Sequence, residues 1–276
     1  MLLAAFPPSV LAQGITRATL KMHHTRNLPR AVSESSGLST FGNRLITHND
    51  SGQRPVLYVL DTSDARVVKE FRLPIQNVDW EDITQDSLYF YLADIGNNYH
   101  IRPLLQIYRI DKKALADDKI VLDSLSVRWP ENPKTGQVFN FNCEAVVSHG
   151  DSLFFFTKEK KGTSVYAIPK TPGVHTAQFK DRFETDILIT GAYLESGHLV
   201  LCGYNRMLRP FLLDMRDFKG TDFFSGSITR IKLCRRFRQI EGITSFNGKD
   251  FYISNEHFRL PWLLNKPQQL HRVTLK

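Results

Sequence analysis

The strongest constraint on the fold of this chain is a polar segment that recurs about every fifty residues. Counted from the polar residue that opens each repeat, the intervals are 45, 63, 46 and 51 residues, at Ser36, Glu81, Glu144, Thr190 and Glu241. Each segment is followed by an apolar run, a turn and a second apolar run. Repeats of this length made of short strands are typical of β-propellers, in which four-stranded sheets surround a central axis.

The first repeat illustrates how a blade is assigned. Residues 43–47 form a first run, Asn49 to Gly52 form a turn, and Val56 to Leu60 form a second run rich in β-branched residues. Outer fourth strands are expected at residues 67–73, 124–129, 185–189 and 228–233. We therefore predict an all-β propeller with five blades, and a sixth blade between Glu81 and Glu144 as the alternative.

The fifth blade lacks an outer strand of its own, because the sequence given ends at Lys276. Residues 18–23, in which Leu20 and Met22 alternate with polar residues, precede the first repeat. Pairing this N-terminal strand with the C-terminal blade would close the ring and remove open edges. The sequence thus predicts a single domain over residues 13–276.

The first twelve residues resemble a signal peptide. They are apolar and end in Ala12, so cleavage before Gln13 would satisfy the small-residue rule. The stretch is too short to span a bilayer and is interrupted by Pro7 and Pro8, so we expect no transmembrane segment. We expect an exported protein, periplasmic or extracellular. The three cysteines, Cys143, Cys202 and Cys234, fall in predicted strands, which favours buried thiols over a disulfide framework.

The net charge of +8 raises the question of an anionic partner. Basic residues are scattered, apart from residues 158–161 and 232–238, and neither cluster carries the aromatic platform of an RNA-binding sheet. We expect a monomer that binds no nucleic acid and takes a small anionic substrate or an extracellular ligand.

The geometry of a propeller predicts where the polar residues meet. The start of each blade's first strand and the end of its second strand lie at one face, so two sets of side chains converge there. The first set is Glu34, Ser36, Glu81, Asp82, Glu144, Thr190 and Glu241. The second set is His48, Asn49, Asp50, Asp94, Asn97, Asn98, Lys158, Asn205, Asn255, Glu256 and His257.

This convergence of carboxylates predicts a cation site. Like charges raise one another's pKa, so the carboxylates need a counter-ion to stay ionised together. Hard oxygen donors suit Ca²⁺, with Mg²⁺ second, whereas zinc ligand spacing is absent. The predicted ligands are the five repeat residues, and Asp50 and Asp94 are also typical turn residues.

Several motifs resemble a family of exported, largely uncharacterised bacterial β-propellers, over nearly the whole chain. They are residues 34–38 (ESSGL), 48–52 (HNDSG), 79–83 (DWEDI), 94–98 (DIGNN), 142–145 and 240–243. The order of the five repeat residues is also similar to the Ser/Glu/Glu/Ser/Glu ring of the calcium-activated nucleotidases, or apyrases, which are five-bladed propellers. That resemblance implies central calcium held by Ser36, Glu81, Glu144, Thr190 and Glu241, with Thr190 standing where that family has serine.

Three functions remain open from the sequence. In the first, a metal-dependent hydrolase cleaves phosphate esters or anhydrides. Asp82, Asp94 or the pair Glu256 and His257 would transfer protons, and Lys158, Arg102 or Lys160 would neutralise charge.

In the second function, calcium only holds the ring together and the mouth binds a partner, with the apolar segment 256–269 as its lip. The third is a lactonase-like enzyme acting on sugars. A fold alone does not separate the three.

Overall fold

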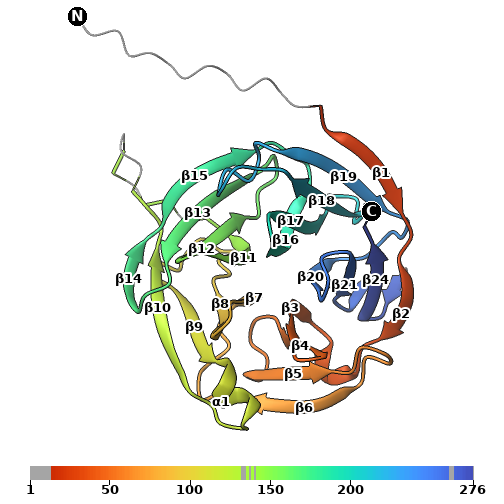
Figure 1. Ribbon diagram of the computed structural model, residues 1–276, viewed down its shortest axis with the longest axis horizontal. Coiled ribbons are helices and arrows are strands. Elements are labelled where there is room, and N and C mark those ends of the chain that lie inside the picture. The colour runs from red at the N-terminus through yellow and green to blue at the C-terminus, as the bar shows by residue number, and fades with distance from the viewer. Residues whose placement is uncertain (1–13, 132–134, 137, 140, 261–263, 276) are drawn as a thin grey trace, which may run out of the picture.

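The protein forms a closed ring of five β-sheets around a central axis (Figure 1). The computed structural model describes residues 14–131, 135–136, 138–139, 141–260 and 264–275. The signal-like segment over residues 1–12 lies outside the described residues. No helix among the described residues is both long and apolar enough to cross a membrane.

Each blade is an antiparallel sheet whose first strand lies nearest the axis (Figure 1). Blade one consists of β3 (Ser35–Phe41), β4 (Arg44–Asn49), β5 (Val56–Leu60) and β6 (Val67–Arg72). Blade two consists of β7 (Trp80–Gln85), β8 (Tyr89–Asp94), β9 (Leu105–Asp111) and β10 (Leu122–Arg128), with the short helix α1 (Lys112–Ala116) after β9. Blade three consists of β11 (Cys143–His149), β12 (Ser152–Thr157), β13 (Thr163–Pro169) and β15 (Gln178–Phe183).

Blade four consists of β16 (Leu188–Glu195), β17 (His198–Tyr204), β18 (Pro210–Arg216) and β19 (Ser227–Leu233). Blade five consists of β20 (Ile240–Ser245), β21 (Asp250–Asn255), β24 (Gln269–Thr274) and, from the N-terminal side, β2 (His23–Asn27). The hairpin of β22 (Phe258–Leu260) and β23 (Leu264–Lys266) stands apart from the blades. The described residues thus form five blades rather than six.

The N-terminal strand closes the ring as predicted, but with a different segment. The pairing strand is β2, with Asn27 opposite Gln269 on β24, and it shares only His23 with the expected segment 18–23. The apolar alternation of Leu20 and Met22 has another cause. Leu20 lies on β1 (Thr16–Leu20), which pairs in parallel with β19, and Met22 is buried between blades four and five. The strand β2 itself is polar, so its sequence carried no alternation to detect.

The predicted outer strand of blade three is wrong. The outer strand is β15, whereas Ile187 and Ile189 of the expected segment 185–189 are buried between blades three and four. Ile187 immediately precedes β16, and Ile189 lies within it. An additional strand, β14 (Gly173–Thr176), leaves blade three and pairs in parallel with β10 of blade two.

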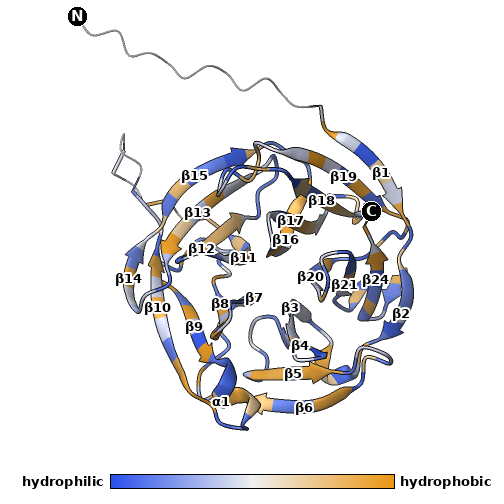
Figure 2. Cartoon of the chain, in the orientation of Figure 1, coloured by the Kyte–Doolittle hydropathy of each residue, from blue (hydrophilic) through white to orange (hydrophobic). Residues whose placement is uncertain are grey.

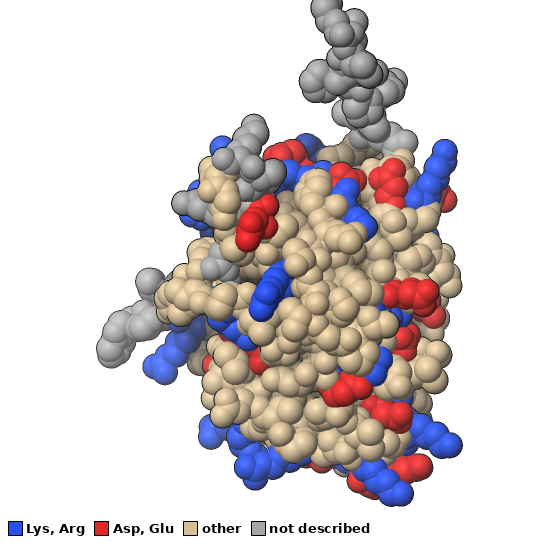
Figure 3. All heavy atoms as spheres, turned by 90° about the vertical axis from the view of Figure 1, so that its left-hand side faces the viewer, with Lys and Arg blue, Asp and Glu red and all other residues tan. Residues whose placement is uncertain are grey.

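The hydrophobic core lies between neighbouring blades rather than at one centre. Five clusters of buried side chains each join two adjacent blades, such as Phe156 of blade three with Leu201 of blade four. The middle strand β5 is mostly apolar and the rim strand β2 mostly polar (Figure 2). On the outer side near β10, β14 and β15, Lys and Arg are interspersed with Asp and Glu (Figure 3), in keeping with scattered solvating charges.

The inner strands approach one another so closely that three of them need glycine, at Gly37, Gly191 and Gly242. A Cβ atom at Gly37 would lie 2.4 Å from the backbone nitrogen of Ile83 in the next blade. A Cβ atom at Gly191 would lie 2.2 Å from the carbonyl oxygen of Glu241. Since the obstructing atoms are backbone, only a shift of a whole strand would relieve the contact.

We predict that Gly37→Ala lowers the free energy of unfolding by about 1–3 kcal/mol or more, because β3 and β7 must move apart. Urea denaturation followed by circular dichroism measures this change. Gly14→Ala is the matched control, because no atom lies within 4 Å of a Cβ at Gly14. Equal stability of the two variants would contradict the close approach of the inner strands.

Candidate cation site at the axial mouth

Every inner strand carries a β-bulge at the same level, and the bulges place the repeat residues. The pairing with the second strand shifts between Ser35 and Leu38 in blade one, and it shifts in the same way in the other four blades. The skipped positions include the five residues that the sequence repeat singled out: Ser36, Glu81, Glu144, Thr190 and Glu241. A bulge re-aims the side chain of the extra residue. The five repeat residues therefore occupy the same position in their blades, as the sequence repeat predicted.

A cavity of about 100 Å³ lies at the mouth where the inner strands begin. Its lining residues are Glu34, Ser36, Asp50, Glu81, Asn98, Glu144, Lys158, Tyr204, Gln239, Glu241 and Glu256. Six of them are carboxylates, and Lys158 alone among these described residues is cationic. The mouth thus has a strong excess of negative charge at full ionisation.

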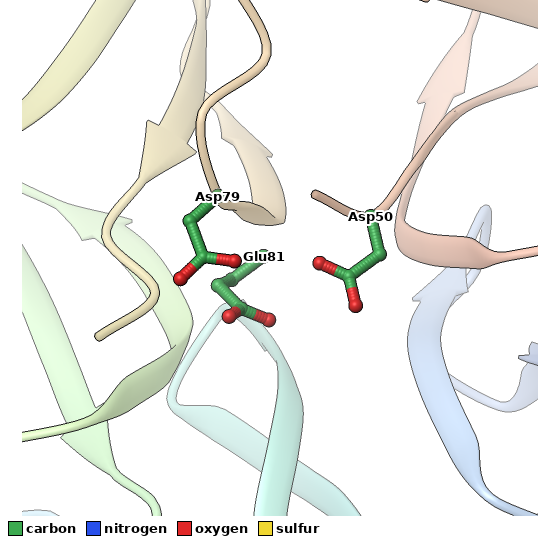
Figure 4. Close-up of side chains that lie close together, drawn as sticks. All are labelled: Asp50, Asp79 and Glu81. Carbon is green, nitrogen blue, oxygen red and sulfur yellow. The ribbon is translucent and has the colours of Figure 1, made fainter. Parts of the chain in front are cut away.

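Three carboxylates form the tightest cluster in the mouth. Oxygen atoms of Asp50, Asp79 and Glu81 lie within 4.8 Å of one another, and Figure 4 shows all three carboxylates directed toward a common space. Asp50 follows β4 of blade one, whereas Asp79 immediately precedes β7 of blade two and Glu81 lies at its start. Two adjacent blades therefore supply oxygen donors to one point.

Backbone geometry holds this cluster in place. The amide of Asp79 donates to Asp94 Oδ1 at 3.1 Å, and Asn77 Nδ2 donates to the carbonyl of Asp50 at 2.7 Å. A Cβ atom at Gly96 would lie 2.1 Å from Glu81 Oε1 and 2.3 Å from Asp79 Cγ. Glycine at position 96 thus leaves the space that these two carboxylates occupy.

The protonation of the mouth reflects burial and mutual repulsion. Burial, followed by repulsion from Glu144, Asp50 and Asp79, raises the pKa of Glu81 well above its usual value. Burial likewise raises the pKa of Asp50 to about 6 and that of Glu256 to about 7. Burial is also the largest cause of the raised pKa of Glu241. A divalent cation bound among these carboxyls would favour their ionised forms and so oppose the rise in their pKa values.

Lys158 is the cation that the chain itself supplies. Burial alone would lower its pKa, but Glu144 and Glu241 outweigh that effect and raise it. Its ammonium forms an ion pair with Glu144 and lies 5.7 Å from the ring centre of Tyr204. Asn142 Nδ2 donates to the other Glu144 oxygen at 2.9 Å. Both carboxylate oxygens of Glu144 therefore have a partner within the protein, whereas Asp50, Asp79 and Glu81 face one another.

Ser36 and Thr190 use their hydroxyls to join blades. Ser36 Oγ donates to the carbonyl of Glu81 at 2.6 Å, and Thr190 Oγ1 donates to the carbonyl of Ile240 at 2.6 Å. Each bond connects one inner strand to the next. Thr190 is not among the described residues that line the mouth cavity.

Asp82, expected as a general base, lies deeper along the axis. Its carboxylate accepts from the amide of Ile83 at 2.8 Å and from the amide of Val146 in blade three at 2.9 Å. Burial raises its pKa to about 8. It does not line the mouth cavity, so the structure places it as a link between blades.

Four other expected participants, Asp94, Arg102, His257 and Lys160, also lie outside the mouth cavity. The buried Asp94 forms an ion pair with Arg102 at 2.6 Å, which engages both charges. His257 is exposed, and its Nε2 lies 2.8 Å from Asn265 Oδ1. Lys160 lines a separate surface pocket with Arg206. Of the expected catalytic residues, the structure brings Lys158 and Glu256 together at the mouth.

The expected lip over residues 256–269 is described in part. Residues 261–263, which include Trp262, lie outside the described residues, and the flanking stretches form the β22–β23 hairpin.

The cysteine prediction holds for Cys143 and Cys202, which are buried free thiols. Cys234 is free but exposed, because it follows the end of β19.

The position two residues before each repeat residue also contributes polar side chains at or beside the mouth. This position holds Glu34, Asp79, Asn142, Leu188 and Gln239. Glu34 and Gln239 line the mouth, and Asp79 belongs to the carboxylate cluster. Glu34 is expected at the mouth from the sequence, and the four polar residues at this repeat position are the signal that could have identified Asp79 and Gln239 as well.

We predict that Glu256→Gln stabilises the metal-free protein increasingly as pH rises. The pKa of Glu256 is raised from 4.5 to about 7, so the fold favours its protonated form. That contribution is fully present below pH 4.5 and is lost as pH rises through 7. The shifted pKa of Glu256 corresponds to roughly 3 kcal/mol, as an upper limit, in the free energy of unfolding between low and high pH.

The measurement is urea unfolding in EDTA across this pH range, as the difference between the variant and the wild type. The difference is needed because burial lowers the pKa of His48 and of His271, which makes stability rise with pH. Glu70→Gln on β6 is the control. If the stability gained by Glu256→Gln over the wild type shrinks with rising pH, Glu256 is not buried among carboxylates at the mouth.

Comparison with known proteins supports the fold. No family model matches the sequence, and no curated protein matches it. The solved glutaminyl cyclase of Myxococcus xanthus is similar with a TM-score of 0.56 and 11% identity, over 95% of this chain and 99% of that one. The aldose sugar dehydrogenase of Streptomyces coelicolor, in its PQQ-bound form, matches with a TM-score of 0.44 and 10% identity, over 91% of this chain and 97% of that one. At 11% identity, the likeness to the glutaminyl cyclase supports the β-propeller architecture of this chain and shows no activity.

Proposed function

We propose that the axial mouth binds one divalent cation, calcium ahead of magnesium, and that the protein acts there as an exported metal-dependent hydrolase of small phosphate esters or anhydrides. The observation that carries the proposal is the convergence of Asp50, Asp79 and Glu81, whose oxygens lie within 4.8 Å of one another. Export rests on the composition of residues 1–12.

The donor set fits a hard cation. Asp50, Asp79 and Glu81 offer carboxylate oxygens from two blades, and Asn98 adds an amide at the edge of the cavity. Calcium prefers six to eight such oxygens in a flexible arrangement, whereas magnesium demands a near-ideal octahedron. The three residues lie on the segment after β4, on the segment before β7 and on β7 itself, and this spread favours the more tolerant ion. The cavity of about 100 Å³ has room for an ion with a few waters.

The chemistry beside the cluster suits hydrolysis. A bound cation would polarise a phosphoryl oxygen and neutralise part of its charge. Glu256, whose pKa is about 7, can accept and return a proton near neutral pH. Lys158, held protonated beside Glu144, can neutralise charge that develops on an anionic substrate.

A non-catalytic binding module with structural calcium is the second candidate. It is favoured by the small size of the cavity and by the ion pair of Lys158 with Glu144, which already satisfies part of the mouth. In that case, the cation would hold blades one and two together, and the rim would bind the partner.

We predict that EDTA-stripped protein binds one calcium ion per chain by isothermal titration calorimetry. Glu81→Gln and Asp79→Asn should each weaken binding by at least about tenfold, which is 1.4 kcal/mol. Gly96→Ala should also weaken it, because the added methyl group would displace the Glu81 carboxylate. Glu70→Gln should leave the affinity unchanged. Absence of binding in folded wild-type protein would reject the cation site.

The two candidates differ in turnover. Calcium-dependent release of phosphate from p-nitrophenyl phosphate, pyrophosphate or a nucleotide, abolished by Glu256→Gln with calcium affinity retained, would support the hydrolase. Calcium binding without turnover of any of these substrates would leave the binding module as the function of the mouth.

A further inference from the structure

The axis ends in a second cavity at the face opposite the acidic mouth. This far cavity has a volume of about 380 Å³ and is lined by the ends of four inner strands, with Lys112 at its side. No residue lines both cavities: Glu81 faces the mouth, Ile83 faces the far cavity, and Asp82 between them bonds to the amides of Ile83 and Val146. The far cavity is therefore a separate compartment.

We propose that the far cavity is a binding site for a neutral, polyhydroxylated small molecule of about monosaccharide size. The proposal is independent of the function proposed for the mouth.

The size and walls of the far cavity suit such a ligand. Its volume falls in the range of about 300–1,000 Å³ that small-molecule sites occupy. Leu38, Ile83, Ala192 and Ile243, at equivalent positions in four blades, give it an apolar inner end. Phe246, with 42% of its surface exposed, offers an aromatic face at the rim. Such a face is a common platform for the C–H groups of a sugar ring.

Hydroxyl groups at one repeat position face the ligand space. Ser39, Thr84 and Thr244 occupy equivalent places on β3, β7 and β20 and all line the cavity. Neither Thr244 nor Thr84 has a side-chain hydrogen-bond partner among the described residues, and neither hydroxyl is fully enclosed by protein. Both hydroxyls are therefore open to a ligand or water in the cavity. These hydroxyls both donate and accept, as the hydroxyls of a polyol do.

The charges around the far cavity balance. Asp86 is saturated, since it accepts from Tyr91 Oη at 2.8 Å and from Lys170 Nζ at 2.9 Å, besides two backbone amides. Lys112 donates to Gln85 Oε1 at 2.6 Å. Glu195 accepts from the hydroxyl of Tyr193, and its other oxygen is free to accept from a ligand hydroxyl. Two cations therefore offset two carboxylates, which favours a neutral ligand over a charged one.

The test uses D-glucose and myo-inositol as probes, with gluconate and glucosamine as charged analogues. Binding to the full chain is measured by saturation-transfer NMR and calorimetry. We expect saturable binding of at least one neutral probe, stronger than binding of either charged analogue. Thr244→Val, which keeps the side-chain shape, should weaken it by about two- to tenfold through loss of a hydrogen bond. Phe246→Ala should weaken it through loss of the aromatic face.

Two matched variants locate the site. Thr229→Val on β19 removes a hydroxyl outside the cavity, and Glu256→Gln changes the opposite mouth; both should bind the probe like the wild type. The proposal is overturned if no neutral probe binds saturably, if a charged analogue binds better, or if Thr244→Val and Phe246→Ala both bind like the wild type. Circular dichroism and the unfolding midpoint show whether each variant is folded, and a loss of calcium binding at the mouth would leave this result unaffected.

Discussion

The close contact of five inner strands around the axis is the constraint on which the rest of the structure depends. Where the strands meet, there is no room for ordinary side chains, so Gly37 and Gly191 face the backbone of the next blade. The remaining polar groups at this level bond across the blades, through Ser36 to the Glu81 carbonyl and through Asp82 to the Val146 amide. The bulges that permit this packing are also what turn the acidic side chains toward the mouth.

The side chains at the mouth are mostly acidic, although the protein as a whole has a positive net charge. The chain carries a net charge of +8, yet six carboxylates and one lysine line the small cavity at the axis. Burial raises the pKa of Glu81 and of Glu144, and the ion pair of Lys158 with Glu144 neutralises only part of the charge. The overall composition of the chain gives no sign of this local excess of carboxylates.

The repeat in the sequence predicted the propeller, the number of blades and the common register of the five bulge residues. These features depend on strand periodicity and repeat length, which a single sequence records. Two outer strands were misplaced, because β2 and β15 are polar rim strands with little of the alternation that identifies a half-buried strand. The partners of individual side chains were not predictable. Asp94 and Asp82 have the residue type of a general base, and only their contacts with Arg102 and with the Val146 amide reveal how each is engaged.

The N-terminal segment has a mechanical consequence. Its first strand, β1, runs along the outer edge of blade four, and its second, β2, completes blade five. A pulling force applied before residue 14 would reach the parallel pairing of β1 with β19 first. The strand that closes the ring would bear load only after β1 had detached. Under tension on the N-terminal end, β1 would therefore unpair from β19 before β2 unpairs from β24, and the ring would stay closed during that first step.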